Sequence, residues 1–133
     1  MENKKTPPSM DQWLQEAKKN PAAANVGMFL AHNGVVRQTP KAKVREGIDD
    51  GSAVKEIEFS YDAAMVEKAI AEAYKMEGIY YIRTWLNQGR LAVGDDIMYI
   101  LIGGDIRPHV VEALQFLVGK IKTECVTEVE HRA

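Results

Sequence analysis

The stretch Gly89–His131, GRLAVGDDIMYILIGGDIRPHVVEALQFLVGKIKTECVTEVEH, decides how we interpret the fold of this chain. Within it, the run Ile97–Ile102 is short and apolar and ends at two glycines, which is typical of a strand buried on both faces. Pro108 can begin a helix soon afterwards, because proline at a first helical position loses no hydrogen bond. The stretch therefore predicts a buried strand followed by a helix that runs to about Ile121.

One lysine, Lys122, lies at the edge of the apolar face of that helix. Asp105 or Ile106 is expected to cap the beginning of the helix. Apolar residues recur at a spacing of three and four, at Val110, Leu114, Leu117, Val118 and Ile121. Lys122 comes four residues after Val118, so its stem can stay dry while its amine lies beside a pocket. The alternative is a lysine that the helix dipole alone favours at a helix end.

The length of the chain fits one domain, and its net charge gives no strong overall electrostatic field. At 133 residues the chain can bury an apolar core and is too short for two ordinary domains. We expect a polar tail over residues 1–8 and a single domain over residues 9–133. The 17 basic and 19 acidic residues give a net charge of −2, so no global field attracts nucleic acid or an acidic membrane. Neither is expected as a partner.

Cysteine usage and hydropathy favour a cytoplasmic protein. Cys125 is the single cysteine, which excludes an internal disulfide and fits a reducing compartment. We interpret it as a buried or incidental thiol rather than a nucleophile. The N-terminus has no apolar signal-like segment, and no stretch approaches the roughly 20 apolar residues of a membrane span.

The sequence predicts no bound metal and no cofactor. His32, His109 and His131 are separated from one another and from the single cysteine, without H-x-x-x-H or C-x-x-C spacing. We expect each histidine to be a surface residue rather than a ligand. Gly103-Gly104 lacks the downstream glycine and the Lys-Ser/Thr pair of phosphate-binding loops.

Spacing and turn residues predict the remaining elements. Ser9 and Gln12 resemble a capping box at the start of a short helix. Ser60 can cap a second main helix that has Asp62 in its first turn and ends near Gly78. Strands are predicted at Val26–Ala31, around Ile57–Phe59, at Ile79–Leu86 and around Val126–Val129. Strands that pair largely antiparallel, with two main helices packed against them, make an α+β fold.

Two segments have two interpretations each. Asn33-Gly34 is either a two-residue hairpin turn or part of a strand with a bulge at Gly34. The segment Gln38–Ser52 is predicted to be a mobile loop because of its proline and glycines. Its basic residues, Lys41, Lys43 and Arg45, either face solvent beside the acidic Glu46, Asp49 and Asp50 or form a flap over an anionic substrate.

Four segments together give the chain a family resemblance. They are Asn33–Arg37 (NGVVR), Val54–Phe59 with Met65–Glu72, Gly89–Ile97 (GRLAVGDDI), and Glu112–Phe116 with Ile121–Thr123. In this order and spacing they resemble the MoaE family, the catalytic large subunit of molybdopterin synthase, from Val26 to about Thr123. The resemblance implies an α/β-hammerhead fold that dimerises through its sheet.

The resemblance also implies an activity, partners and site residues. Enzymes of this family add two sulfurs to cyclic pyranopterin monophosphate, each carried as a thiocarboxylate on the C-terminal Gly-Gly of a small ubiquitin-like subunit. The implied assembly is a homodimer at the core of a heterotetramer. Arg37 matches the arginine of the family's G-x-V-R element, Arg107 the arginine of its His-Arg pair, and Lys122 its pocket lysine. Guanidinium groups suit a cyclic phosphate, so we expect Arg37 and Arg107 to converge on one substrate pocket, with Lys122 catalytic. Pairing of either arginine with a carboxylate is the structural alternative.

Three departures from the family pattern leave two functions open. Ile106 replaces the histidine before Arg107, Leu86-Asn87 replaces a His-Arg pair, and a second pocket lysine, seven residues after Lys122, falls on Val129. The first function is a divergent synthase subunit that transfers sulfur. The second is a paralogue that binds a pterin or the carrier without turnover.

Overall fold

Two antiparallel sheets of three strands form the framework in the computed structural model, which describes residues 3–49 and 51–132. The first sheet has the order β1-β5-β3 and contains β1 (Met28–Val35), β5 (Asp96–Gly104) and β3 (Ile79–Leu86). The second has the order β4-β2-β6 and contains β4 (Gly89–Ala92), β2 (Val54–Tyr61) and β6 (Val126–Arg132). The α+β class is confirmed, with two small sheets where the sequence suggested one.

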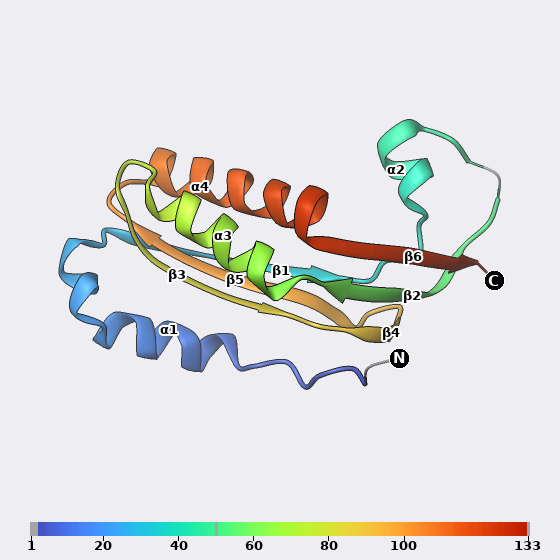
Figure 1. The fold of residues 1–133 in the computed structure, drawn as a ribbon, viewed down its shortest axis with the longest axis horizontal. Coiled ribbons are helices and arrows are strands. Elements are labelled where there is room, and N and C mark those ends of the chain that lie inside the picture. Colours follow the sequence, from blue (N-terminus) through green and yellow to red (C-terminus); the bar gives the residue numbers. More distant parts are fainter. Residues whose placement is uncertain (1–2, 50, 133) are drawn as a thin grey trace.

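Helices cover both faces of the first sheet. The helices of the described residues are α1 (Met10–Lys19), α2 (Lys41–Glu46), α3 (Ala63–Tyr74) and α4 (Arg107–Lys120), with a 3₁₀ turn at Pro21–Asn25 and a π-helical turn at Ile121–Cys125. The two main helices, α3 and α4, lie side by side on one face, and α1 lies on the other (Figure 1). The short helix α2 stands apart from this stack, near β2 and β6 (Figure 1).

The core divides at β5 because successive strand residues point to opposite faces. Ile100 and Ile102 are fully buried and pack with the apolar stripe of α4, whose buried members are Val110, Ala113 and Leu117. Leu101 points the other way and packs against Trp13 and Ala17 of α1. The predicted buried strand and the predicted helical stripe are therefore both confirmed.

The glycines that end β5 allow close packing. A Cβ on Gly103 would lie 2.6 Å from Cε1 of Phe29, and one on Gly104 would lie 2.6 Å from the Gly78 carbonyl oxygen. Gly78 itself has a φ of 78°, which favours glycine. Gly103 lets Phe29 of β1 pack against the end of the strand, and Gly104 lets Val110 of α4 and Ile79 of β3 do so.

Several local predictions need correction. Ser60 lies inside β2, and the cap of α3 is Asp62, whose side chain accepts a hydrogen bond from the Met65 N–H. The first strand begins at Met28 rather than Val26 and continues through Asn33-Gly34. Its register against β5 shifts between Gly34 and Val35, so the bulge interpretation is confirmed and the hairpin is wrong.

The segment 38–52 is not entirely loop. Pro40 precedes the two-turn helix α2, and Gly47, with a φ of 71°, ends it in a left-handed conformation. Asp50, which we grouped with the acidic half of this segment, lies outside the described residues.

The chain before α1 packs against the framework although it forms no regular element from residue 3 to residue 9. The Lys5 N–H donates to Asn87 Oδ1 at 2.7 Å, and Lys5 Nζ donates to the Leu86 carbonyl at 2.8 Å and to the Tyr61 hydroxyl. Ser9 caps α1 by accepting from the Gln12 N–H, as predicted. Among the residues described, none of the helices combines the length and apolar character that crossing a bilayer requires.

Candidate functional site

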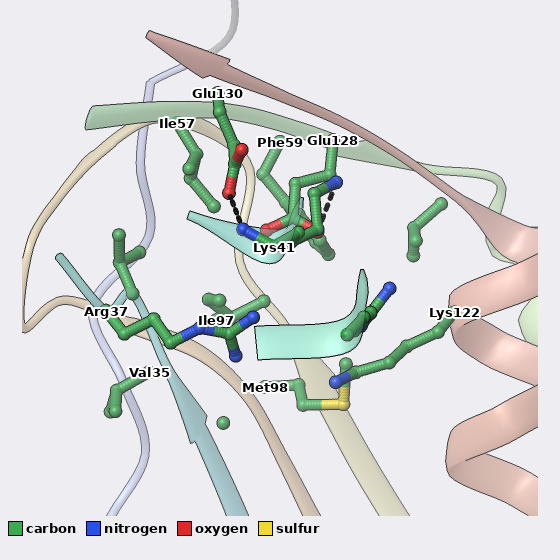
Figure 2. Close-up of a pocket in the computed structure, with 14 residues that line it drawn as sticks. Val35, Arg37, Lys41, Ile57, Phe59, Ile97, Met98, Lys122, Glu128 and Glu130 are labelled. Carbon is green, nitrogen blue, oxygen red and sulfur yellow. Dashed lines mark hydrogen bonds and ion pairs between the residues drawn. The ribbon is translucent and has the colours of Figure 1, made fainter. Parts of the chain in front are cut away.

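A pocket rich in positive charge lies where β1, β6, α2 and the π-helical turn meet. Four of its lining side chains are cations: Arg37, Lys41, Arg45 and Lys122. Two are carboxylates, Glu128 and Glu130, and its apolar floor includes Ile57, Phe59, Ile97 and Met98. Figure 2 shows Arg37 and Lys122 reaching into this pocket from opposite sides, with Lys41 beside Glu128 and Glu130.

Lys122 reaches the pocket from the π-helical turn that follows α4. The helix was predicted to run to about Ile121, and α4 ends at Lys120. The residue as a whole is exposed, while its amine turns toward Met98 inside the pocket (Figure 2). Partial burial lowers the pKa of this amine, and the charges of Arg45, Arg37 and Lys41 lower it further, against the opposing effect of Glu128.

Arg37 follows the edge strand β1 and lines the same pocket. Its Nε donates to the Thr39 carbonyl at 3.1 Å, and it forms no ion pair with any carboxylate among residues 3–49 and 51–132. The alternative, in which a carboxylate neutralises Arg37, is therefore wrong for the described residues. Its terminal nitrogens are available to an anionic ligand.

Arg107 lies at the other end of α4. It is the first residue of a helix of 14 residues, and such a helix is about 20 Å long. Lys122 follows the last residue of the same helix, and Arg107 is exposed and does not line the pocket. Within one copy of the chain, the structure does not bring Arg37 and Arg107 together.

Val129 points away from the pocket. Successive residues of β6 alternate between the two faces of the sheet, so Glu128 and Glu130 line the pocket while Thr127 and Val129 line an open groove on the other face. A lysine at position 129 would lie in that groove. The interpretation that Val129 stands where a pocket cation is missing is therefore wrong for this backbone.

His32 is a pocket neighbour that the sequence did not single out. It lies on β1, two residues before Gly34, and its Nε2 is buried without a hydrogen-bond partner among the described residues. Burial lowers the pKa of its imidazole, and the charge of Lys122 lowers it further. We had expected a surface histidine. Its spacing of two from Gly34, on the strand that leads to Arg37, is the signal that could have identified it.

The other residues that depart from the family pattern, and the single cysteine, have structural surroundings. Asn87 is buried, and its side chain donates to the Asp96 carbonyl at 2.8 Å and accepts from the Lys5 N–H. Ile106 is half exposed at the cap of α4. Cys125 is buried, as one of the two interpretations of this thiol expected, and burial raises the pKa of the thiol.

Comparison with known proteins gives one family and a consistent set of folds. The sequence matches the protein family described as "MoaE protein" over residues 4–124. No curated protein matches the chain.

Solved structures resemble this one over most of its length. Molybdopterin synthase from Staphylococcus aureus superposes with a TM-score of 0.69 at 20% identity, covering 96% of this chain and 87% of that chain. A molybdopterin biosynthesis MoaE protein from Burkholderia ambifaria MC40-6 gives 0.69 at 18%, covering 96% and 85%. A complex of subunits 1 and 2 of molybdopterin-converting factor from Helicobacter pylori 26695 gives 0.64 at 16%, covering 92% and 78%. At these identities the likeness shows the fold.

Proposed function

Since this chain belongs to the MoaE protein family, as a large subunit with a role in molybdenum cofactor biosynthesis, we propose that it transfers sulfur to cyclic pyranopterin monophosphate. The sulfur would come from the thiocarboxylated C-terminal Gly-Gly of a small ubiquitin-like carrier. The Helicobacter pylori neighbour is a complex of two subunits, which supports a small partner subunit. The observation that carries the proposal is the amine of Lys122, partly buried in a pocket with Arg37 and Arg45.

The pocket's cations suit a phosphate-bearing substrate. Arg37 has a guanidinium without a carboxylate partner among the described residues, and such a group can bind a phosphate with two parallel hydrogen bonds. The apolar floor formed by Ile57, Phe59 and Met98 offers a surface for the fused rings of a pterin. Arg37 is therefore the proposed phosphate-binding residue.

Lys122 is the proposed catalytic residue. A lysine with a lowered pKa has a larger neutral fraction near neutral pH and can accept or donate a proton. In its protonated form it can stabilise negative charge that develops on the acyl group and on sulfur as the carbon–sulfur bond of the carrier's thiocarboxylate breaks. Both roles require the amine inside the pocket, which is where Figure 2 shows it.

Arg107 keeps a place in this proposal only if a second copy of the chain supplies it. The distance along α4 excludes a contact with the pocket of its own copy. We propose a homodimer at the core of a heterotetramer, in a cytoplasmic protein. Because β1 and β3 are the edges of the first sheet, their unpaired backbone groups are available for pairing with another chain.

Reconstitution tests the proposal. The purified chain, mixed with a thiocarboxylated carrier and the cyclic phosphate precursor, is expected to form molybdopterin, which is detected after oxidation by fluorescence and mass spectrometry. The matched control is the same carrier with an ordinary C-terminal carboxylate, which has no sulfur to transfer. A folded protein that binds both partners and forms no product would contradict sulfur transfer.

Ile106 stands where the family pattern has a histidine, and this replacement favours a second candidate function, a binding module. Ile106 has no titratable group and is half exposed beside Arg107. A module of this kind would bind the precursor or the carrier without consuming the thiocarboxylate. Calorimetry that shows binding, together with mass spectrometry that shows an intact thiocarboxylate after incubation, would support this candidate over the enzyme.

A further inference from the structure

The strand β6 contributes negative rather than positive charge to the pocket. Glu128 and Glu130 face into it, and Val129 faces the opposite side of the sheet. Positive charge on this side comes from α2 instead, through Lys41 and Arg45. The two elements are far apart in sequence and meet at the pocket.

The contacts of Lys41 hold α2 against β6. The Lys41 N–H donates to Glu130 Oε2 at 3.0 Å, and Lys41 Nζ lies 3.5 Å from Glu128 Oε2 (Figure 2). One residue therefore contacts both carboxylates that line the pocket, and Glu130 also accepts a hydrogen bond from Arg132 at 3.2 Å. Because Lys41 is used in this way, it does not supply a free charge to a ligand.

Arg45 lies on the same short helix and has no such partner. Its side chain forms no hydrogen bond and no ion pair with any residue in the described ranges 3–49 and 51–132, and it lines the pocket. After burial, its charge is the largest cause of the lowered pKa of Lys122. Two cations that repel each other across a pocket are stabilised when an anion lies between them.

We propose that α2 is an anion-binding element of the pocket. In it, Arg45 supplies a cation that binds the anion together with Lys122, and Lys41 anchors the helix to Glu128 and Glu130. The ligand class is an oxyanion of phosphate, which a guanidinium binds in a bidentate manner. The inference rests on the proposed function in one respect, which is that the bound phosphate belongs to the cyclic phosphate precursor. Of the two interpretations of the basic residues in segment 38–52, this inference favours the flap over an anionic substrate, and it does so for Arg45.

Lys43 provides a matched control on the same helix. Its Nζ lies 3.2 Å from Asp49 Oδ2, both side chains are about half exposed, and Lys43 does not line the pocket. Removal of either Lys43 or Arg45 deletes one positive charge from α2. If phosphate binding depends only on the overall charge of α2, it should weaken equally in the two variants. If it depends on a specific contact with Arg45, it should weaken only when Arg45 is removed.

The test is a titration with inorganic phosphate at low ionic strength, followed by ¹H–¹⁵N NMR. Arg45→Ala is expected to raise the dissociation constant about 10-fold, as for the loss of one charge-assisted hydrogen bond. Lys43→Ala is expected to change it by less than about twofold, because its charge is distant and screened. Equal effects of the two substitutions would overturn the role of Arg45.

A second background tests the anchor. In Glu128→Gln/Glu130→Gln the contacts of Lys41 are weakened, and Arg45→Ala should then change phosphate affinity by less than about twofold because α2 no longer holds Arg45 in place. An undiminished effect of Arg45→Ala in this background would overturn the anchoring role.

The controls separate this inference from the proposed function. If Arg37→Ala and Lys122→Ala weaken phosphate binding while Arg45→Ala does not, the inference about α2 fails and the anion pocket stands. If none of the three substitutions weakens binding, the pocket is not an anion site, and the proposed binding of the precursor there fails with it.

Discussion

Two lysines at the C-terminal end of α4, two residues apart, lie in opposite electrostatic surroundings. Lys120 Nζ is 2.8 Å from Glu124 Oε2 and 3.7 Å from Glu72 Oε2, and its pKa is raised, chiefly by the hydrogen bond to Glu124. Lys122 turns into the pocket, where burial and neighbouring cations lower its pKa. The same residue type at the same helix end is thus a paired surface charge in one case and an unpaired pocket charge in the other.

The difference shows which charges serve the surface and which are left for a ligand. Ion pairs between exposed side chains contribute little to stability and are common on any helix. A group of cations without carboxylate partners is unfavourable unless something else compensates it. Arg37, Arg45 and Lys122 form such a group, and this is the strongest physical argument that the pocket binds an anion.

The largest expected effect separates the two lysines by activity. Lys122→Ala should abolish sulfur transfer in the reconstituted assay, because it removes the amine from the pocket. Its fold should change little, since a lysine near a helix end contributes only about 0.3–1 kcal/mol through the dipole. Lys120→Ala, the matched control, should keep its activity. Equal activities in the two folded variants would remove Lys122 from the mechanism.

Arg37 and Arg90 extend the comparison to arginines. Arg37→Ala should weaken binding of the cyclic phosphate precursor by about 1.5–3 kcal/mol, the usual range for a hydrogen bond to a charged group. Arg90 is an exposed arginine paired with Glu56 and Glu58, so Arg90→Ala should leave the affinity nearly unchanged. Isothermal calorimetry measures both. A loss of affinity in Arg90→Ala as large as in Arg37→Ala would mean that overall charge, rather than an unpaired guanidinium, binds the ligand.

Gly119 tests whether the pocket end of α4 is constrained by packing. A Cβ on this helical glycine would meet nothing within 4 Å, so Gly119→Ala should stabilise the protein by about 0.5–1 kcal/mol in denaturant unfolding. Gly103→Ala should be destabilising instead, because its Cβ would meet Phe29 at 2.6 Å. If Gly119→Ala is destabilising, the end of α4 that carries both lysines is packed more tightly than the structure indicates.

The smallest expected effect is at the other end of α4. A hydrogen bond to Asp105 raises the pKa of His109, with Nδ1 2.7 Å from Asp105 Oδ1. A histidine whose pKa is higher in the folded state stabilises the protein fully below its unfolded pKa and loses that contribution as the pH rises through its folded pKa. The free energy of unfolding should therefore fall slightly across that window, and His109→Gln should flatten the curve. An unchanged curve in the variant would show that His109 does not carry this pH dependence.

Much of the framework could be predicted from local pattern. The β3 strand begins at Ile79 and ends at Leu86, as predicted, because its turn residues bound an apolar run. The apolar stripe of α4 and the position of Lys122 at its border follow from helical periodicity. These features depend on residues close together in sequence.

The rest depends on contacts between distant residues. The short helix α2 is held by Glu128 and Glu130, which are 87 and 89 positions from Lys41, so its own sequence is not sufficient to predict it. Pro40 and Gly47 at its ends were the available signal. The direction of Val129 could not be predicted either, because a one-residue change in strand register reverses every side chain. The separation of Arg107 from the pocket of its own copy could not be predicted, because a family motif gives no distance along α4.

A direct measurement of the two lysines tests the central claim, that Lys122 is an unpaired and partly buried cation in an anion-binding pocket. ¹³C NMR of the side chains in lysine-labelled protein, titrated from neutral to alkaline pH, gives separate midpoints for Lys120 and Lys122, assigned with the two alanine variants. We predict that Lys122 titrates at a lower pH than Lys120, and that Arg45→Ala moves the Lys122 midpoint upward. A midpoint for Lys122 at or above that of Lys120 would contradict the account.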